Sequence, residues 1–178
     1  MIGVEKDKVI LVEYNDNWKD EFIDIKSNLL KILGNNVIEI HHIGSTAIKG
    51  IVAKPIMDIN VIIQSKELLN IKGMEEAGYL YKGDYETFGQ LFEYGVKDNI
   101  VTQHVKCYLE NNKNHNDVVL FCEFLNKNSE YAKQYNDLKI ELARKYPDNR
   151  VAYIEAKTEF IKKINSRIKI ENQRVKNK

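Results

Sequence analysis

The residues best suited to chemistry lie in one short stretch of the chain, between positions 41 and 60. A β-rich run ends there in Gly44-Ser45-Thr46, where the chain is predicted to enter a helical turn. Such a turn can present backbone N–H groups and hydroxyls to a phosphate, and glycine lets the ligand approach the backbone closely. The stretch therefore predicts a phosphate cradle, and a tight turn without any ligand is the alternative.

A carboxylate follows on the next β-rich run, residues 56–63. Alternation along a strand places Asp58, Asn60 and Ile62 on one face. A charged carboxylate inside an Ile- and Val-rich strand is costly unless a partner uses its charge. A divalent cation beside the bound phosphates is one such partner, and backbone amides that donate to a structural Asp58 are the other.

Three basic or titratable residues lie near the cradle within this stretch. Lys54 is a candidate phosphate contact, and an ordinary solvated lysine is the alternative. His41 and His42 directly precede the cradle, but neighbours on a strand point to opposite faces. We therefore expect at most one of them in the pocket, and His42 shares a face with Gly44 under this alternation.

The elements that must position these residues follow from apolar periodicity. We predict a strand at 8–14, followed by a helix that Asn15 or Asp16 caps and Gly34 ends. Strands at 37–43 and 56–63, a helix from Ser65 to Gly78 and an antiparallel meander over 79–109 come next. Helical spacing then predicts a helix at 117–127, a helix capped by Ser129 and a last helix that starts at Pro147. We expect a single domain over 1–178, with a sheet-containing core at 1–110 and C-terminal helices at 111–178.

Composition narrows the classes of partner. The chain has 27 Lys plus Arg against 26 Asp plus Glu in 178 residues, so it has no global positive field and a nucleic-acid partner is not expected. Basic residues gather from position 162 onward, where they complement a helix C-terminus.

No apolar run approaches the roughly 18 residues of a membrane span, and the charged opening is unlike a signal peptide, so we expect a cytoplasmic protein. Cys107 and Cys122 lie in apolar runs and are expected to be reduced core residues.

The segment HHIGSTAIKGIVAKPIMDINVII, residues 41–63, resembles the signature of the GrpB family. The similarity continues over nearly the whole chain. It includes the early Tyr14-to-Trp18 motif, LFCEFLN at 120–126, Tyr135 with Leu138-Lys139 and Leu142-Ala143, and Tyr153 with Lys157 and Phe160-Ile161.

This resemblance implies a nucleotidyltransferase-like α+β fold, in which a mixed α/β arrangement of sheet and flanking helices is followed by a C-terminal helical region. In active members of that superfamily, Gly-Ser cradles nucleotide phosphates and two or three carboxylates hold two Mg²⁺. Carried over, Gly44 and Ser45 are the cradle and Asp58 is the first metal carboxylate. The second acidic position falls on Asn60, whose neutral amide offers one oxygen but no charge.

Two further positions depart from the family pattern. The third carboxylate is expected on a later strand, where this chain has His104, which suits zinc, manganese or proton transfer better than Mg²⁺. A strand histidine satisfied by a backbone partner is the alternative. The arginines common in the family are replaced within residues 85–90 and at Cys122. This chain therefore lacks, at these two places, the guanidinium groups that would bind phosphate.

Three functions remain open from the sequence. The first is a metal-dependent nucleotidyltransferase: Asp58 and His104 are catalytic, Asp58, Asn60 and His104 hold Mg²⁺ or Mn²⁺, and Gly44, Ser45, Thr46 and Lys54 bind the nucleotide. The second is a module that binds a small phosphorylated ligand after losing its catalytic metal. The third is a helper domain that docks a protein partner through its C-terminal helices, as the fusion of a similar domain to dephospho-CoA kinase in some organisms suggests.

Overall fold

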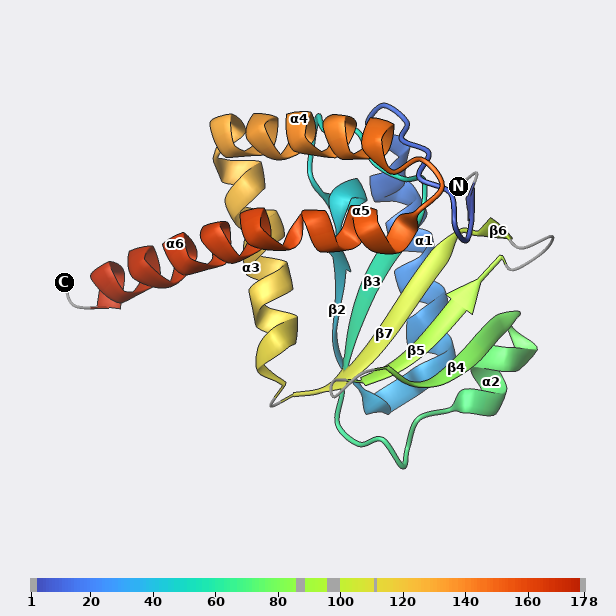
Figure 1. Cartoon of the computed structure of the whole chain (residues 1–178). Coiled ribbons are helices and arrows are strands. Elements are labelled where there is room, and N and C mark those ends of the chain that lie inside the picture. The colour runs from blue at the N-terminus through green and yellow to red at the C-terminus, as the bar shows by residue number, and fades with distance from the viewer. Residues whose placement is uncertain (1–2, 86–88, 96–99, 111, 177–178) are drawn as a thin grey trace.

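The computed structural model describes residues 3–85, 89–95, 100–110 and 112–176. Its centre is a five-stranded mixed sheet in the order β2-β3-β7-β5-β4 (Figure 1). The strands are β2 Val37–Ile43, β3 Met57–Ile63, β4 Tyr79–Tyr85, β5 Gly89–Tyr94 and β7 Gln103–Leu109. The β3–β7 pair is parallel and the other three pairs are antiparallel. Two short strands, β1 Val4–Glu5 and β6 Ile100–Val101, pair separately.

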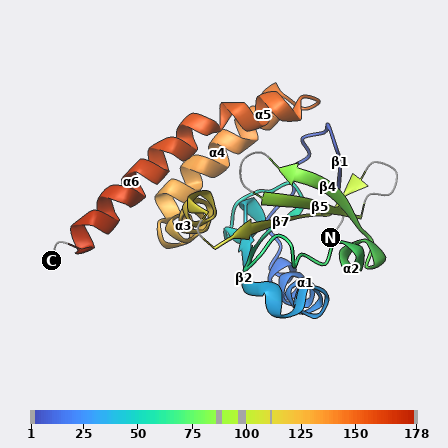
Figure 2. The ribbon, with the colours of Figure 1, turned by 90° about the horizontal axis from the view of Figure 1, so that it is seen from below.

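Helices cover both faces of this sheet (Figure 2). Helix α1, Asn17–Leu33, packs on one face, and the short α2, Ile71–Glu76, lies beside β4. The other four helices follow the last strand and lie toward the opposite face: α3 Lys113–Lys127, α4 Ser129–Lys145, α5 Arg150–Ala156 and α6 Thr158–Lys176. Among the described residues, no helix combines the length and the apolar character needed to cross a membrane.

Burial divides the residues of β3 between these two layers. Ile59, Val61 and Ile63 belong to the core cluster beneath α1, together with Trp18 and Leu29 of that helix. Every residue of β3 is buried except Asp58, which lies at the start of the strand. The strand alternation predicted from the sequence is therefore present, and it directs the one carboxylate of β3 away from the α1 core.

Most predicted elements are confirmed, including the α+β class, the strand at 37–43, the strand predicted at 56–63 and observed at 57–63, the meander of β4, β5 and β7, and the helix that ends at Gly34. Gly34 adopts a φ of +57° at the helix end, a backbone conformation that suits glycine. Cys107 and Cys122 are free and buried, as expected.

The predicted first strand at 8–14 is wrong. Only Val12 pairs, in one isolated antiparallel bridge to Ala53, while Val9 turns into a separate apolar cluster with Leu142 and Tyr153. The alternation of apolar residues here reflects contacts with a loop and with helices, so it does not mark a sheet strand.

Two predicted helix boundaries also need correction. Ser65 accepts from the backbone N–H of Glu67 in a local turn, and the helix starts later, where Asn70 caps it. At the C-terminal end, Asn149 caps α5 by accepting from Ala152, two residues beyond the predicted start at Pro147. The last helix is also two helices, because α5 ends at Ala156 before α6 begins.

Candidate functional site

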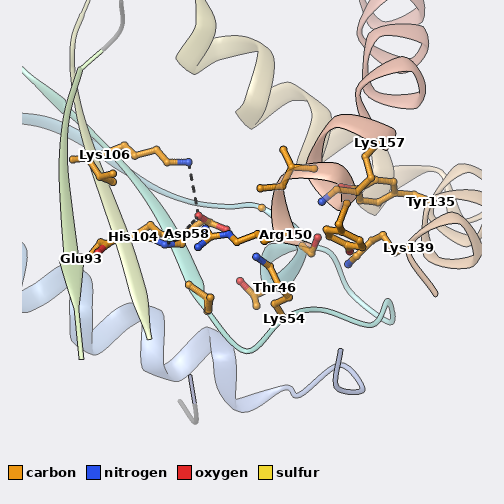
Figure 3. A pocket seen from close by; sticks show the side chains of 16 residues that line it. Thr46, Lys54, Asp58, Glu93, His104, Lys106, Tyr135, Lys139, Arg150 and Lys157 are labelled. Carbon is orange, nitrogen blue, oxygen red and sulfur yellow. Dashed lines mark hydrogen bonds and ion pairs between the residues drawn. The ribbon is translucent and has the colours of Figure 1, made fainter. Parts of the chain in front are cut away.

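A cavity of ≈ 380 Å³ opens at the end of the sheet where β3 and β7 begin. The sheet provides one wall through Asp58, Glu93, His104 and Lys106, and the loop after β2 provides a second. Helices α4 and α5 close the opposite side (Figure 3). The volume lies within the range of small-molecule sites.

Gly44 makes the sharp turn that brings the loop against β3. Its φ is +74°, and a Cβ added there would lie 2.8 Å from Oδ2 of Asp58. The next three residues, Ser45–Ala47, form a short 3₁₀ turn. Ser45 is hydrogen-bonded to Tyr135 of α4, so the turn is tied to the helical wall. Glycine is thus needed here first for the close approach of the Asp58 carboxylate.

Asp58 is held by two basic side chains from the neighbouring strand. Its Oδ1 lies 3.1 Å from Nδ1 of His104, the residue directly opposite in the parallel register, and 3.8 Å from Nζ of Lys106. Burial alone raises the pKa of Asp58, but Lys106, His104 and Lys54 outweigh it and lower that pKa well below its ordinary value. The carboxylate is therefore ionised at neutral pH.

His104 connects this carboxylate to an arginine from the helical wall. Its imidazole is buried, with Nδ1 facing Asp58 and Nε2 3.5 Å from a terminal guanidinium nitrogen of Arg150. A neutral imidazole with its proton on Nδ1 donates to Asp58 and accepts from Arg150. The three side chains form one connected row across the cavity.

Basic side chains dominate the lining of the cavity. Five basic side chains line it, against two carboxylates: Lys54, Lys106, Lys139, Arg150 and Lys157 against Asp58 and Glu93. Burial, followed by the charge of Arg150, lowers the pKa of Lys54 to about 8, and burial with the charge of Lys54 does the same for Lys157. These lysines therefore lie close enough to repel one another. An incoming anion would reduce this repulsion.

Lys139 is the most buried of the five. Its side chain is 1% exposed and donates to the backbone carbonyl of Val52. Burial, with smaller effects from Lys157 and Lys54, lowers the pKa of Lys139 well below its ordinary value. An amine on helix α4 is thus brought against the loop that also holds Lys54.

Glu93 is the second carboxylate of the cavity. It lies on β5, opposite His104 in the antiparallel register, and its Oε2 is 3.1 Å from Nζ of Lys6 and 4.0 Å from Nζ of Lys82. Sequence reasoning missed it, although the signal was available. Like Asp58, it is a charged residue inside a mostly apolar strand.

Most of the predicted site residues line this one cavity, namely Gly44, Ser45, Thr46, Lys54, Asp58 and His104. Asn60 does not line it. Its side chain is buried, and among the described residues its Oδ1 has no hydrogen-bond partner. The face that alternation assigns to Asn60 is correct, but the cavity does not extend that far along β3.

The histidines before the cradle stay outside the cavity. His42 stacks on Phe22 of α1, with ring centroids 5.1 Å apart, and its Nε2 is hydrogen-bonded to Oγ1 of Thr46. The prediction that His42 shares a face with Gly44 fails because β2 ends at Ile43 and Gly44 turns the chain, so strand alternation does not continue.

Four basic residues of the cavity were absent from the predicted site: Lys106, Lys139, Arg150 and Lys157. Lys139 and Lys157 belong to helix motifs that the sequence singled out, but nothing in helical spacing shows that they face the sheet. Arg150 supplies the cavity with a guanidinium, a group that the sequence did not predict for this site. The run at 85–90, where the family arginines were sought, includes residues 86–88 outside the described part of the chain.

The residues present do not fit the metal centre expected from the sequence. The described part of the chain contains no group of three or more His, Cys, Asp or Glu that could hold a metal ion. Asp58 and His104 contact each other, Lys106 contacts the same carboxylate oxygen, and Asn60 lies off the cavity wall. The expected set of Asp58, Asn60 and His104 is therefore not assembled.

Comparison with known proteins finds relatives over nearly the whole chain. Residues 8–167 match the family model described as "GrpB protein". The glutamate-rich protein GrpB of Alkalihalophilus pseudofirmus is 37% identical over 170 residues, which cover 92% of this chain and 98% of that protein. The crystal structure of the conserved protein GrpB from Enterococcus faecalis has a TM-score of 0.81 at 30% identity, covering 92% of this chain and 99% of that one.

A more distant likeness concerns the fold alone. The Cid1 poly(U) polymerase, in a structure with Mg 3′-dATP bound, has a TM-score of 0.54 at 11% identity. The match covers 81% of this chain and 49% of that one. The mixed sheet and its helices are thus nucleotidyltransferase-like.

Proposed function

Because this chain belongs to the GrpB family and has a nucleotidyltransferase-like fold, we propose that it binds a nucleotide or another small phosphorylated molecule in the cavity beside Asp58. The observation that carries this proposal is the basic lining of the cavity, where four basic side chains and the buried amine of Lys139 converge from the loop, β7 and the helices against two carboxylates. A phosphate group is a compact anion that such a cluster can neutralise.

The wall of the cavity also offers an apolar part to the organic half of such a ligand. Leu91 of β5 and Ile154 of α5 line it, and Ile154 is 45% exposed. A phosphorylated molecule with an apolar or aromatic group can place its phosphates among the lysines and that group against Ile154.

The proposal stops at binding. Metal-dependent nucleotidyl transfer needs acidic ligands for the metal ions, and this chain has Asn60 at the second acidic position, off the cavity wall. Asp58 already pairs with His104 and Lys106.

A thermal-shift screen with ATP, GTP, CTP, UTP and dephospho-CoA tests this function. A true ligand at 100 times its Kd should stabilise the protein by about 2.7 kcal/mol, because it binds only the folded state. Arg150→Gln should weaken that binding about tenfold or more, since it removes charge-assisted hydrogen bonds worth about 1.5–3 kcal/mol.

Arg144→Gln is the matched control, because Arg144 is exposed on α4 and does not line the cavity. Its affinity should equal that of the wild-type protein. If none of the five ligands stabilises the protein, or if both arginine variants bind equally well, the cavity is not a phosphate site.

A further inference from the structure

We infer that the cavity takes its phosphorylated ligand as the free anion, without a divalent metal ion, and that Lys106 occupies the position beside Asp58 that a metal ion would need. This inference rests on the proposed function and makes it more specific. It concerns the charge state of the ligand and the residue that neutralises the carboxylate.

Lys106 is placed by the sheet to do this. It lies two residues after His104 on β7, so both side chains project from the same face of the strand. Its Nζ reaches Oδ1 of Asp58, the same oxygen that His104 contacts (Figure 3). One oxygen of the Asp58 carboxylate, Oδ1, is therefore already shared by two basic side chains.

The other carboxylate is satisfied in the same way. Glu93 pairs with Lys6 and Lys82, outside the group of basic residues that line the cavity. Neither carboxylate of the wall is left without a cationic partner. A divalent ion would have to displace lysines from both in order to gain two acidic ligands.

The remaining basic side chains have no such partners. Among the described residues, Lys54, Arg150 and Lys157 have no carboxylate within ion-pair distance, although they lie in one buried cluster. Repulsion within this cluster opposes the entry of a second cation and favours an anion that brings no cation with it. A metal-free phosphate group offers more negative charge than its metal complex does, so the cluster selects the free form.

Isothermal titration calorimetry with inorganic tripolyphosphate and with ATP tests this inference in the wild-type protein. We expect binding in EDTA, and an apparent affinity about tenfold or more weaker in excess Mg²⁺, because the metal ion competes with the lysines for the phosphates. Titration with Mn²⁺ alone should give no binding.

Lys106→Gln should weaken tripolyphosphate binding in EDTA about tenfold, because one cation beside the ligand is lost. Lys72→Gln should leave it unchanged, since Lys72 is exposed on α2 and does not line the cavity. The EDTA and Mg²⁺ comparison uses wild-type protein, so it decides the question even if Lys106→Gln does not fold.

Failure of the free-anion inference and failure of the proposed function give different results in these titrations. Binding that requires Mg²⁺ or Mn²⁺, or is tighter with them, overturns the free-anion inference and leaves the proposed function standing. No binding of either probe in any of these buffers overturns both.

Discussion

At the scale of single residues, Gly44 is required by its own backbone conformation, which has a positive φ, and by its contact with Asp58. Gly50 lies in the same loop with a similar φ of +77°, but an added Cβ there would meet nothing within 4 Å. The two glycines therefore separate backbone strain from the cost of displacing Asp58.

We predict that Gly44→Ala lowers the free energy of unfolding more than Gly50→Ala does. Both substitutions place a side chain on a residue of positive φ, which costs about 1–3 kcal/mol. Only Gly44→Ala also pushes the Asp58 carboxylate away, which adds about 1–3 kcal/mol as overpacking does elsewhere. Urea denaturation measures both values, and equal losses would show that Gly44 and Asp58 are not in contact.

The residues that sequence reasoning brought to the site share one property, because they all lie on strands or on the turn that joins them. The short link between β2 and β3 forces Gly44 and Asp58 together, and a charge in a buried strand marks Asp58. The family resemblance puts Asn60 at the second acidic position and alternation puts it on the face of Asp58, but neither shows how far a cavity extends along the strand.

At the scale of elements, the helices show why the rest of the site was not predictable. Lys139 follows Tyr135 by four residues, so it shares that buried face of α4, yet apolar periodicity assigns a lysine to solvent. Packing between elements decides which helix faces the open end of the sheet. The spacing of residues within one helix carries no information about that choice.

The buried amine of Lys139 predicts a pH-dependent stability. Burial lowers its pKa, so between that pKa and the ordinary value of 10.5 the unfolded chain binds a proton that the folded chain lacks. Folding is then more favourable as pH rises. Lys139→Met removes this term, and the stability of the variant relative to the wild-type protein should fall by up to about 1.4 kcal/mol per pH unit as the pH rises toward 10.5.

Chemical denaturation at several pH values measures this difference. Cysteines and tyrosines titrate in both proteins, so their contributions cancel. Exposed Lys72→Met should show no such trend. A difference between Lys139→Met and wild type that does not change with pH would mean that Lys139 keeps an ordinary pKa.

At the scale of the whole molecule, the cavity exists because distant segments close on one another. The loop before β3 is held by α4, since the N–H of Val52 donates to Asn136 Oδ1 and its carbonyl accepts from Lys139. The N-terminal segment is fixed in the same way, because the N–H of Val9 donates to the carbonyl of Pro147. Each contact joins residues more than 80 positions apart. The family resemblance implied the fold that makes them, but local sequence signals did not contain them.

The affinity of Asp58→Asn for ATP, measured by calorimetry in EDTA, most directly tests whether this cavity is a metal-free anion site. The substitution keeps an oxygen that accepts from His104 but removes the negative charge with which Lys106 pairs, so the net positive charge around the ligand increases. We predict that ATP binds about three- to tenfold more tightly than to the wild-type protein. A loss of affinity of about tenfold or more would contradict this, because it would mean that Asp58 serves the ligand directly or through a metal ion.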